Sequence, residues 1–112
     1  TLIRQEEQQL YEYDEYKLQI RRLDFGKKRG IYEFSTYDPE TKDTPPSWGL
    51  HPYAEVGVIL EGKMEVNLDG TVYLLGPGDS IYIKPNLYHT MRNAGDTPCR
   101  SFWHLQIMDD SV

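Results

Sequence analysis

Turn-forming residues divide this chain into segments that are too short to make stable helices. Asp69-Gly70 is a strong signal for a two-residue hairpin, because glycine readily adopts a positive φ. Glycine and proline recur at 76–79 and 94–98, where further turns are expected. The segments between the turns alternate apolar and polar residues or are rich in β-branched and aromatic residues, as strands are. The pattern therefore predicts an all-β fold, a small antiparallel β-barrel or jelly-roll sandwich.

The expected strands follow one another at near-regular spacing. The first surrounds Leu18 and Ile20, and the others span residues 31–36, 54–60, 63–68, 71–75, 80–83, 88–93 and 100–108. At 112 residues the chain is a single domain, in which residues 1–16 form an N-terminal arm and residues 17–108 form the barrel. Within the arm, residues 5–10 are too few to be trusted as a helix.

Charge and composition exclude several classes of partner. The formal net charge of −6 disfavours contact with nucleic-acid phosphates or anionic lipid. Basic residues concentrate at 17–29, but they fall in an alternating strand and a turn, so we interpret them as a solvated surface. The single cysteine, Cys99, cannot form an internal disulfide, and there is neither a secretory signal pattern nor an apolar run of roughly 20 residues. We therefore expect a cytoplasmic protein without membrane contact. Because the sequence starts at Thr1 without an initiator methionine, we expect it to be cut from a longer protein.

Two histidines and a glutamate form the most informative polar set. Side chains alternate along a strand, so His51 and Glu55 project to the same side if the chain between them is extended, as Pro52 favours. His89 lies on a second expected strand, and two histidines with one carboxylate can hold a divalent metal. The same three residues can equally line a dry polar pocket, where they bond to one another or to a ligand's carboxylate or hydroxyl. Either interpretation places His51, Glu55 and His89 at one binding site.

Several neighbours are candidates for the walls of this site. They are Tyr53, Tyr82, Met91 and Asn93. With the polar set they would form a small, mostly apolar pocket with a few convergent polar groups, the usual form of a small-molecule site. His104 is expected to make only a local hydrogen bond, and Cys99 has no neighbouring base that would make it a nucleophile.

The spacing of these residues resembles the cupin family. Its first motif ends with a histidine, a short gap, a glutamate, six residues and a glycine, as in His51, Glu55 and Gly62. Its second motif runs from a glycine to a histidine eleven positions on, and then to an asparagine after three more residues, as in Gly78, His89 and Asn93. The resemblance implies a cupin barrel with a ligand or metal site in its interior.

Two positions depart from the family pattern. Gly49 stands two residues before His51, where the family has its first metal-binding histidine, and glycine cannot ligate a metal. Asn86 stands where the family has a turn glycine, and asparagine is the residue next best able to adopt a left-handed conformation. The resemblance therefore implies a site of three ligands, His51, Glu55 and His89, with open positions that are compatible with Fe, Mn, Ni, Zn or Cu.

A second resemblance covers nearly the whole chain. The segments 2–7, 55–62, 68–75, 78–82 and 89–98 are similar to the C-terminal cupin sensor domain of bacterial helix-turn-helix regulators of the XRE type. This resemblance implies a DNA-binding domain upstream of Thr1. The sequence itself supplies no recognition helix, and its acidic balance fits a domain that leaves contact with DNA to another module.

These observations predict the sensor domain of a bacterial transcriptional regulator that binds a small polar metabolite, either directly or through a metal. A free-standing metalloenzyme of the dioxygenase, isomerase or lyase type is the alternative, and a structural dimerisation module with a filled pocket is a third interpretation. The apolar face of Val56, Val58 and Leu60, opposite Glu55, predicts a homodimer in which that face is covered.

Overall fold

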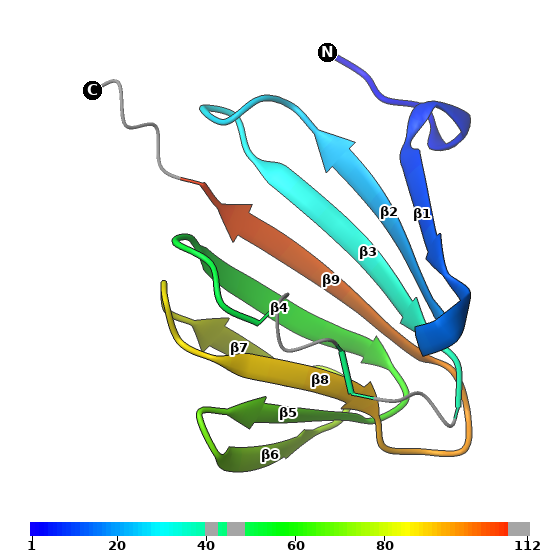
Figure 1. The fold of residues 1–112 in the computed structure, drawn as a ribbon. Coiled ribbons are helices and arrows are strands. Elements are labelled where there is room, and N and C mark those ends of the chain that lie inside the picture. The colour runs from blue at the N-terminus through cyan, green and yellow to red at the C-terminus, as the bar shows by residue number, and fades with distance from the viewer. Residues whose placement is uncertain (40–42, 45–48, 108–112) are drawn as a thin grey trace.

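The alternating segments of the sequence fold into strands, and the fold class is all-β as predicted (Figure 1). The structure is a computed structural model that describes residues 1–39, 43–44 and 49–107. Its elements in chain order are η1 (Gln5–Glu7), β1 (Gln9–Tyr13), η2 (Asp14–Tyr16), β2 (Leu18–Asp24), β3 (Ile31–Tyr37), β4 (Ala54–Glu61), β5 (Met64–Leu68), β6 (Thr71–Leu75), β7 (Ser80–Ile83), β8 (His89–Asn93) and β9 (Cys99–Gln106). The predicted strands agree closely with these bounds, and the predicted end at Met108 lies outside the described residues.

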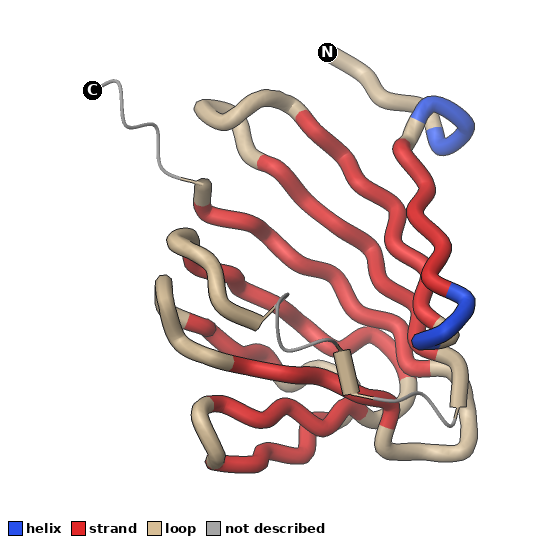
Figure 2. The backbone as a smooth tube through the Cα atoms, in the orientation of Figure 1, coloured by secondary structure: helices blue, strands red, loops and turns tan. Residues whose placement is uncertain are grey.

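The described strands form two antiparallel sheets. The larger sheet has the order β1-β2-β3-β9-β4-β7, and the smaller sheet has the order β6-β5-β8. Figure 2 shows the smaller sheet beside β4 and β7, while β1 and β2 extend away from it. Among the described strands no backbone ladder joins the two sheets at their edges. The fold is therefore a jelly-roll-like sandwich and not a barrel closed by hydrogen bonds.

The expected N-terminal arm is partly a strand. It contains β1, which pairs with β2 from Gln9 opposite Arg22 to Tyr13 opposite Leu18, and which makes one edge of the larger sheet. Tyr11 and Tyr13 share a side of the sheet, because side chains alternate along a strand. The acidic residues around this segment obscured its alternation in the sequence. A strand this short is stable through its ladder with β2, which sequence patterns do not display.

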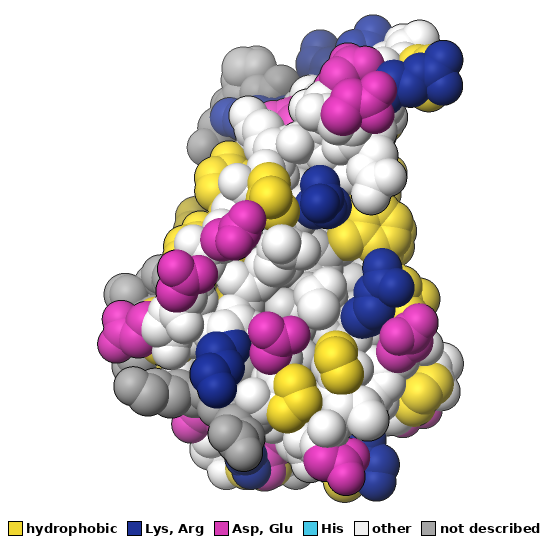
Figure 3. All heavy atoms as spheres, turned by 90° about the vertical axis from the view of Figure 1, so that its right-hand side faces the viewer, with side chains coloured by type: hydrophobic (Ala, Val, Ile, Leu, Met, Phe, Trp, Pro, Cys, Tyr) yellow, Lys and Arg dark blue, Asp and Glu magenta, His cyan; other side chains and the backbone are white. Residues whose placement is uncertain are grey.

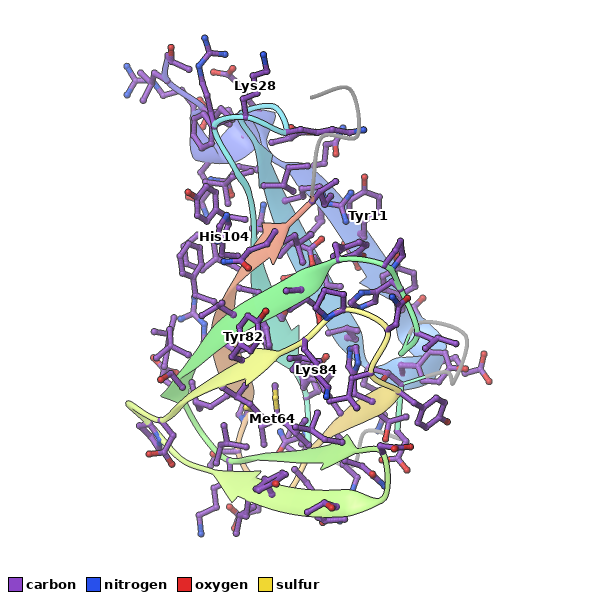
Figure 4. All side chains as sticks on the ribbon, turned by 90° about the vertical axis from the view of Figure 1, so that its left-hand side faces the viewer. Tyr11, Lys28, Met64, Tyr82, Lys84 and His104 are labelled. Atoms are coloured by element: carbon purple, nitrogen blue, oxygen red, sulfur yellow. The ribbon has the colours of Figure 1, made fainter. Side chains whose placement is uncertain are left out.

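The core lies between the two sheets and is built from alternate residues of their strands. Ile59 of β4 is 1% exposed, whereas its neighbour Leu60 is 46% exposed. Between Glu55 and Leu60, the odd-numbered residues of β4 therefore face inward and the even-numbered residues outward, as alternation predicts. Met64 of β5 is fully buried, and Figure 4 shows it between the strands of the two sheets. Burial of an apolar side chain of this size stabilises the fold by about 1.5–3 kcal/mol.

Left-handed residues close the turns at the positions that the sequence indicated. Asp69 and Gly70 have φ angles of 48° and 94° and link β5 to β6 as a two-residue hairpin. Asn86, at the turn-glycine position, has a φ angle of 60°. Its backbone N–H donates to the carbonyl of His51 at 2.8 Å. The turn before β8 is therefore tied to the segment before β4.

Charged side chains of both signs cover the surface beside β1. Figure 3 shows Lys and Arg interspersed with Asp and Glu on this side of the molecule, without a continuous basic stripe. This distribution agrees with the interpretation of segment 17–29 as a solvated surface. Arg22 is the exception, because its side chain faces inward on the same side of β2 as Leu18 and Ile20. In the described ranges no helix is both long and apolar enough to cross a membrane.

The packing of Trp103 on Gly57 provides a test of the fold. A Cβ atom at Gly57 would lie 2.4 Å from the indole ring, which is buried, so Gly57→Ala must displace the ring or the strand. We expect this variant to lose about 1–3 kcal/mol of unfolding free energy in urea denaturation. Gly76→Ala is the matched control, because the nearest atom to its new Cβ lies at 3.9 Å. Equal stability of the two variants would contradict this packing.

Candidate metal centre and cavity

Three polar side chains meet where the two sheets face each other. His51 lies just before β4, Glu55 lies in β4, and His89 begins β8 of the smaller sheet. The Nε2 atoms of His51 and His89 lie 3.6 and 3.2 Å from Oε2 of Glu55. One donor atom from each of the three residues lies within 4.8 Å of the others. The structure thus brings together the three residues that the sequence predicts to converge.

Backbone carbonyls fix the orientation of both imidazole rings. Nδ1 of His51 lies 2.8 Å from the carbonyl oxygen of Tyr53, and Nδ1 of His89 lies 2.8 Å from that of Leu87. A carbonyl oxygen can only accept, so each Nδ1 carries a proton. Nε2 then carries a second proton that points at Glu55 when the ring is charged, and a free lone pair for a metal when the ring is neutral. The His51 ring also stacks on Tyr53, with 4.0 Å between the ring centroids. Histidines that ligate metals are usually held by a second hydrogen bond of this kind.

Glu55 is a mostly buried carboxylate that stays charged. Burial alone would raise the pKa of Glu55, but its hydrogen bonds with His51 and His89 and their charges lower it to about 2. The hydrogen bond to Glu55 in turn raises the pKa of His51, against the opposing effect of burial. A carboxylate in such a place is stabilised either by imidazole protons or by a metal cation bound to the same atoms.

The donor set fits a divalent transition metal. Two neutral imidazole nitrogens and one carboxylate oxygen suit Fe, Mn, Ni, Zn or Cu, and their preset orientation lowers the entropy lost when a metal binds. Three protein ligands leave coordination positions for oxygen or nitrogen atoms of a bound molecule. His51, Glu55 and His89 could therefore hold both a metal and, through it, a ligand in the adjoining cavity.

Close backbone contact explains why glycine stands at position 49. The carbonyl of Gly49 accepts a hydrogen bond of 2.9 Å from the N–H of His89. A Cβ atom at Gly49 would lie 1.7 Å from the carbonyl oxygen of His89, which is far inside van der Waals contact. The glycine is thus required by the approach of two backbone segments, in addition to lacking a metal-binding side chain. Among the described residues, the candidate metal ligands of this site are therefore three, His51, Glu55 and His89.

Two of the predicted wall residues line the cavity, namely Tyr53 and Met91. Tyr82 lies elsewhere, contrary to the sequence prediction. It is 56% exposed, and it pairs with Val56 on the outward side of the larger sheet. The prediction failed because β7 runs antiparallel to β4 in a register that faces Tyr82 away from Glu55.

Asn93 is also placed away from the cavity. It is 3% exposed, and its side-chain amide donates to the carbonyls of Tyr37 and Thr97 at 2.9 and 2.8 Å. Its side-chain oxygen accepts from the N–H of Gly95 at 2.7 Å. The asparagine therefore fastens the turn that follows β8 and does not face a ligand, although it shares a strand with His89.

The cavity extends well beyond the metal centre. Its volume is about 470 Å³, and its far wall is formed by β1, β2 and β3. Lining residues that the sequence interpretation did not place at the site include Tyr11, Tyr13, Arg22, Glu33, Tyr37 and Trp103. Strict alternation from Leu18 and Ile20 would have placed Arg22 inward, but its position in a basic run argued for the surface. Glu33 shares an inward face with Ser35 and the buried Tyr37, but the charge of Glu33 masked this face in the sequence.

His104 and Cys99 lie apart from the cavity. The His104 ring stacks on Tyr32, with 4.8 Å between centroids, and Figure 4 shows His104 and Tyr11 on opposite sides of β9. Cys99 is fully buried, and burial raises the pKa of its thiol to about 11. Its thiolate, the reactive form, is therefore scarce near neutral pH. Neither arrangement is that of an activated nucleophile.

An antiparallel sandwich with two histidines and a carboxylate converging between its sheets defines a class of β-domains with an internal polar site. The family model described as the cupin domain matches residues 33–105, which is more than half of the chain. The chain therefore belongs to the cupin family.

Curated relatives share part of the chain. Polyketide synthase CurC from Streptomyces cyaneus is 39% identical over 56 residues, which cover 49% of this chain and 36% of that protein. The chain spans less than half the length of the curated relatives it matches.

Solved structures share the fold over most of the chain. A cupin-2 domain protein from Rhodospirillum rubrum has a TM-score of 0.78 at 18% identity, over 98% of this chain and 76% of that one. The Cupin_2 domain of an XRE-family transcriptional regulator from Enterobacter cloacae has a TM-score of 0.71 at 14% identity, over 83% of this chain and 99% of that one. At these identities the likeness establishes the fold alone.

Substitution of Gly49 tests whether a fourth protein ligand can be added. The clash with His89 arises at Cβ, so Gly49→His and Gly49→Ala should destabilise the domain together, by about 1–3 kcal/mol or more. We expect both melting temperatures to fall, and the zinc affinity of Gly49→His, measured by calorimetry, not to exceed that of the wild type. A Gly49→His variant that melts like the wild type and binds zinc more tightly would refute this account.

Proposed function

We propose that this domain is the cytoplasmic, effector-binding sensor domain of a bacterial transcriptional regulator. In this proposal, its cavity holds a small polar metabolite beside a divalent transition metal, one of Zn, Mn, Fe, Ni or Cu, on His51, Glu55 and His89. One observation carries the proposal. Carbonyls engage both Nδ1 atoms, and both Nε2 atoms therefore face the carboxylate at the wall of a cavity large enough for a metabolite.

The chemistry of the centre supports an oxygen-rich ligand. A metal bound there supplies a Lewis acid with open positions, which carboxylate, hydroxyl or carbonyl oxygens can occupy. Beside the centre, Tyr53 and Met91 offer one aromatic wall with a polar tip and one soft apolar wall. Such a mixture binds a small molecule through a few polar contacts and surrounds the rest with apolar surface.

The ionisable groups near the centre favour binding over proton transfer. Glu55 is already engaged by two imidazoles, which leaves it a poor proton acceptor. Burial raises the pKa of Tyr37 above its usual range, and burial also raises the pKa of Tyr53. An efficient general acid or base has a pKa near the working pH, so these shifts move both tyrosines further from catalytic use.

Support for a regulatory role comes from the relatives. The Enterobacter cloacae domain belongs to a transcriptional regulator, and the alignment covers 99% of it. The sequence segments that resemble such sensors run through the sheets described above. The coding sequence upstream of Thr1 tests this part of the proposal, because a regulator of this type has a helix-turn-helix domain there.

We also propose a homodimer through the outward face of β4. Val56, Val58 and Leu60 lie on that face, and Tyr82 of β7 lies beside Val56. A ligand can switch a dimeric regulator only by binding one arrangement of the dimer more tightly than the other. A monomer in light scattering would count against both the dimer and this form of switching.

A free-standing metalloenzyme of the dioxygenase, isomerase or lyase type is the second candidate function. The three-ligand set favours it, because open positions can orient a substrate as well as an effector. Turnover by the metal-loaded protein that is lost in His51→Ala would support the enzyme. Ligand binding without turnover would support the sensor.

Metal binding is the most direct test of the centre. The wild type should bind stoichiometric Zn²⁺ or Mn²⁺ in elemental analysis, and should gain about 2.7 kcal/mol of stability when free metal is 100-fold above its Kd. Glu55→Gln and His51→Ala should lose the bound metal and this gain, because each removes one of three ligands.

The chain offers a matched histidine control. His104 is stacked on Tyr32 on the outward face of β9, so His104→Ala should keep the metal at the wild-type level. Equal loss of metal in His104→Ala and His51→Ala, or a wild type that stays free of metal under these conditions, would overturn the centre as a metal site.

A further inference from the structure

A second polar group faces the cavity on the side opposite the metal centre. Arg22 of β2 and Glu33 of β3 are directly paired across the strands, and both line the cavity. The guanidinium Nε and Nη2 donate to Oε2 of Glu33 at 2.9 and 2.6 Å. The Arg22 guanidinium carbon also lies 5.5 Å from the centroid of the Tyr11 ring, at the sheet edge.

The register of the larger sheet sets the distance between the two polar groups. Arg22, Glu33, Trp103 and Gly57 are successive partners across β2, β3, β9 and β4, so they form one row on the inner face. Glu55 lies two residues from Gly57 on the same side of β4. The backbones of β3 and β4 are two strand spacings apart, about 10 Å. The indole of Trp103 on β9 lies between the two polar groups. The cavity therefore has two polar ends and an aromatic middle.

The ion pair at the far end is electrically balanced. Arg22 is matched by Glu33, so the pair presents no net charge to a ligand. Both hydrogen bonds end on Oε2 of Glu33, which leaves Oε1 as an acceptor, while Nη1 of Arg22 remains a donor. The pair thus offers both donor and acceptor capacity, which suits a hydroxyl or a carboxamide because either group can donate and accept at once. A second carboxylate would meet the charge of Glu33 as well as that of Arg22.

Burial distinguishes this pair from an ordinary surface ion pair. The Glu33 side chain is 12% exposed and that of Arg22 is 34% exposed. The chain contains a second cross-strand pair of the same chemistry, Glu65 with Arg92, whose side chains are 29% and 41% exposed and lie outside the cavity lining. Removing charges from water costs free energy that their attraction only partly offsets. A pair kept at a cavity wall, with bonding capacity left over, therefore has the properties of a recognition element.

We propose that the Arg22–Glu33 pair determines ligand specificity, and that it selects small organic acids whose far end carries a hydroxyl or carboxamide in place of a second anion. The inference rests on the proposed function, in which the acid's carboxylate is held at the His51–Glu55–His89 centre. The pair and the centre lie on different strands, so the two ends of the ligand are recognised independently.

Three acids that share one six-carbon chain test this specificity on the zinc-loaded protein by calorimetry. They are hexanoate, 6-hydroxyhexanoate and adipate, with a methyl, a hydroxyl and a carboxylate at the far end. The wild type should bind 6-hydroxyhexanoate about fivefold more tightly than the other two, the usual contribution of a hydrogen bond. Equal affinities, or a preference for hexanoate or adipate, would overturn the inference.

Charge substitutions at the pair should change this preference in opposite directions. Glu33→Gln leaves Arg22 unbalanced, so adipate should gain about tenfold relative to 6-hydroxyhexanoate. Arg22→Gln leaves Glu33 unbalanced, so 6-aminohexanoate, which carries an ammonium group, should gain by a similar factor. Circular dichroism shows whether each variant folds. If one variant does not fold, the other still tests the inference, because the two substitutions are independent. Glu65→Gln is the matched control and should keep the wild-type order; variants at the pair that also keep it would refute the inference.

Titrations without zinc separate this inference from the proposed function. If none of the three acids binds without zinc, the carboxylate end of the ligand is held at the metal centre. If the zinc-loaded protein then prefers 6-hydroxyhexanoate, the far end of the ligand is recognised by the Arg22–Glu33 pair. If the zinc-loaded protein binds the three acids equally, the role of the Arg22–Glu33 pair in specificity is refuted, while metal-dependent binding in the cavity is still supported. Zinc binding with no binding of any acid counts against both.

Discussion

The carboxylate of Glu55 lies between imidazoles from different parts of the fold, and this contact fixes how the two sheets meet. His51 precedes β4 of the larger sheet, whereas His89 begins β8 of the smaller one. A buried carboxylate is unfavourable unless it is paired, so the sheets must approach closely enough for both rings to reach it. Backbone hydrogen bonds from Asn86 to His51 and from His89 to Gly49 hold the same approach. Beyond this point the larger sheet extends past the smaller one, which leaves its inner face free to wall a cavity.

The close approach of the two sheets at Glu55 has two consequences for the chemistry of the site. Close contact of the segment before β4 with β8 leaves no space for a side chain at position 49, so that position offers no donor, and the described residues present three donor side chains that could hold a metal. The same segment carries Tyr53, whose carbonyl orients the ring of His51 and whose own ring stacks on it. The backbone thus keeps position 49 free of a side chain and determines which imidazole nitrogens face the carboxylate.

Sequence reasoning predicted the centre because its signals are local. Period-two alternation and the family spacing sufficed to bring His51, Glu55 and His89 together. Asn86 was identified as a left-handed turn residue because it stands where the family has a turn glycine and asparagine readily adopts that conformation. Arg22 was missed because its place in a basic run outweighed the alternation that points it inward. Its pairing with Glu33 depends on the register of β2 against β3, which no local pattern encodes. Tyr82 was placed wrongly for the same kind of reason, since which side of a strand faces inward depends on its pairing partner.

The division of the cavity between strands has an evolutionary consequence. The centre is built from β4, β8 and their preceding segments, whereas the far wall belongs to β1, β2 and β3, which follow one another in the chain and pair as a meander. Substitutions in that meander would change the shape and polarity of the far wall without replacing Glu55 or either histidine. Within the first third of the chain, sequence changes would therefore remodel one wall of the cavity, while Tyr53, Met91 and Trp103 would keep the rest of its lining beside the two histidines.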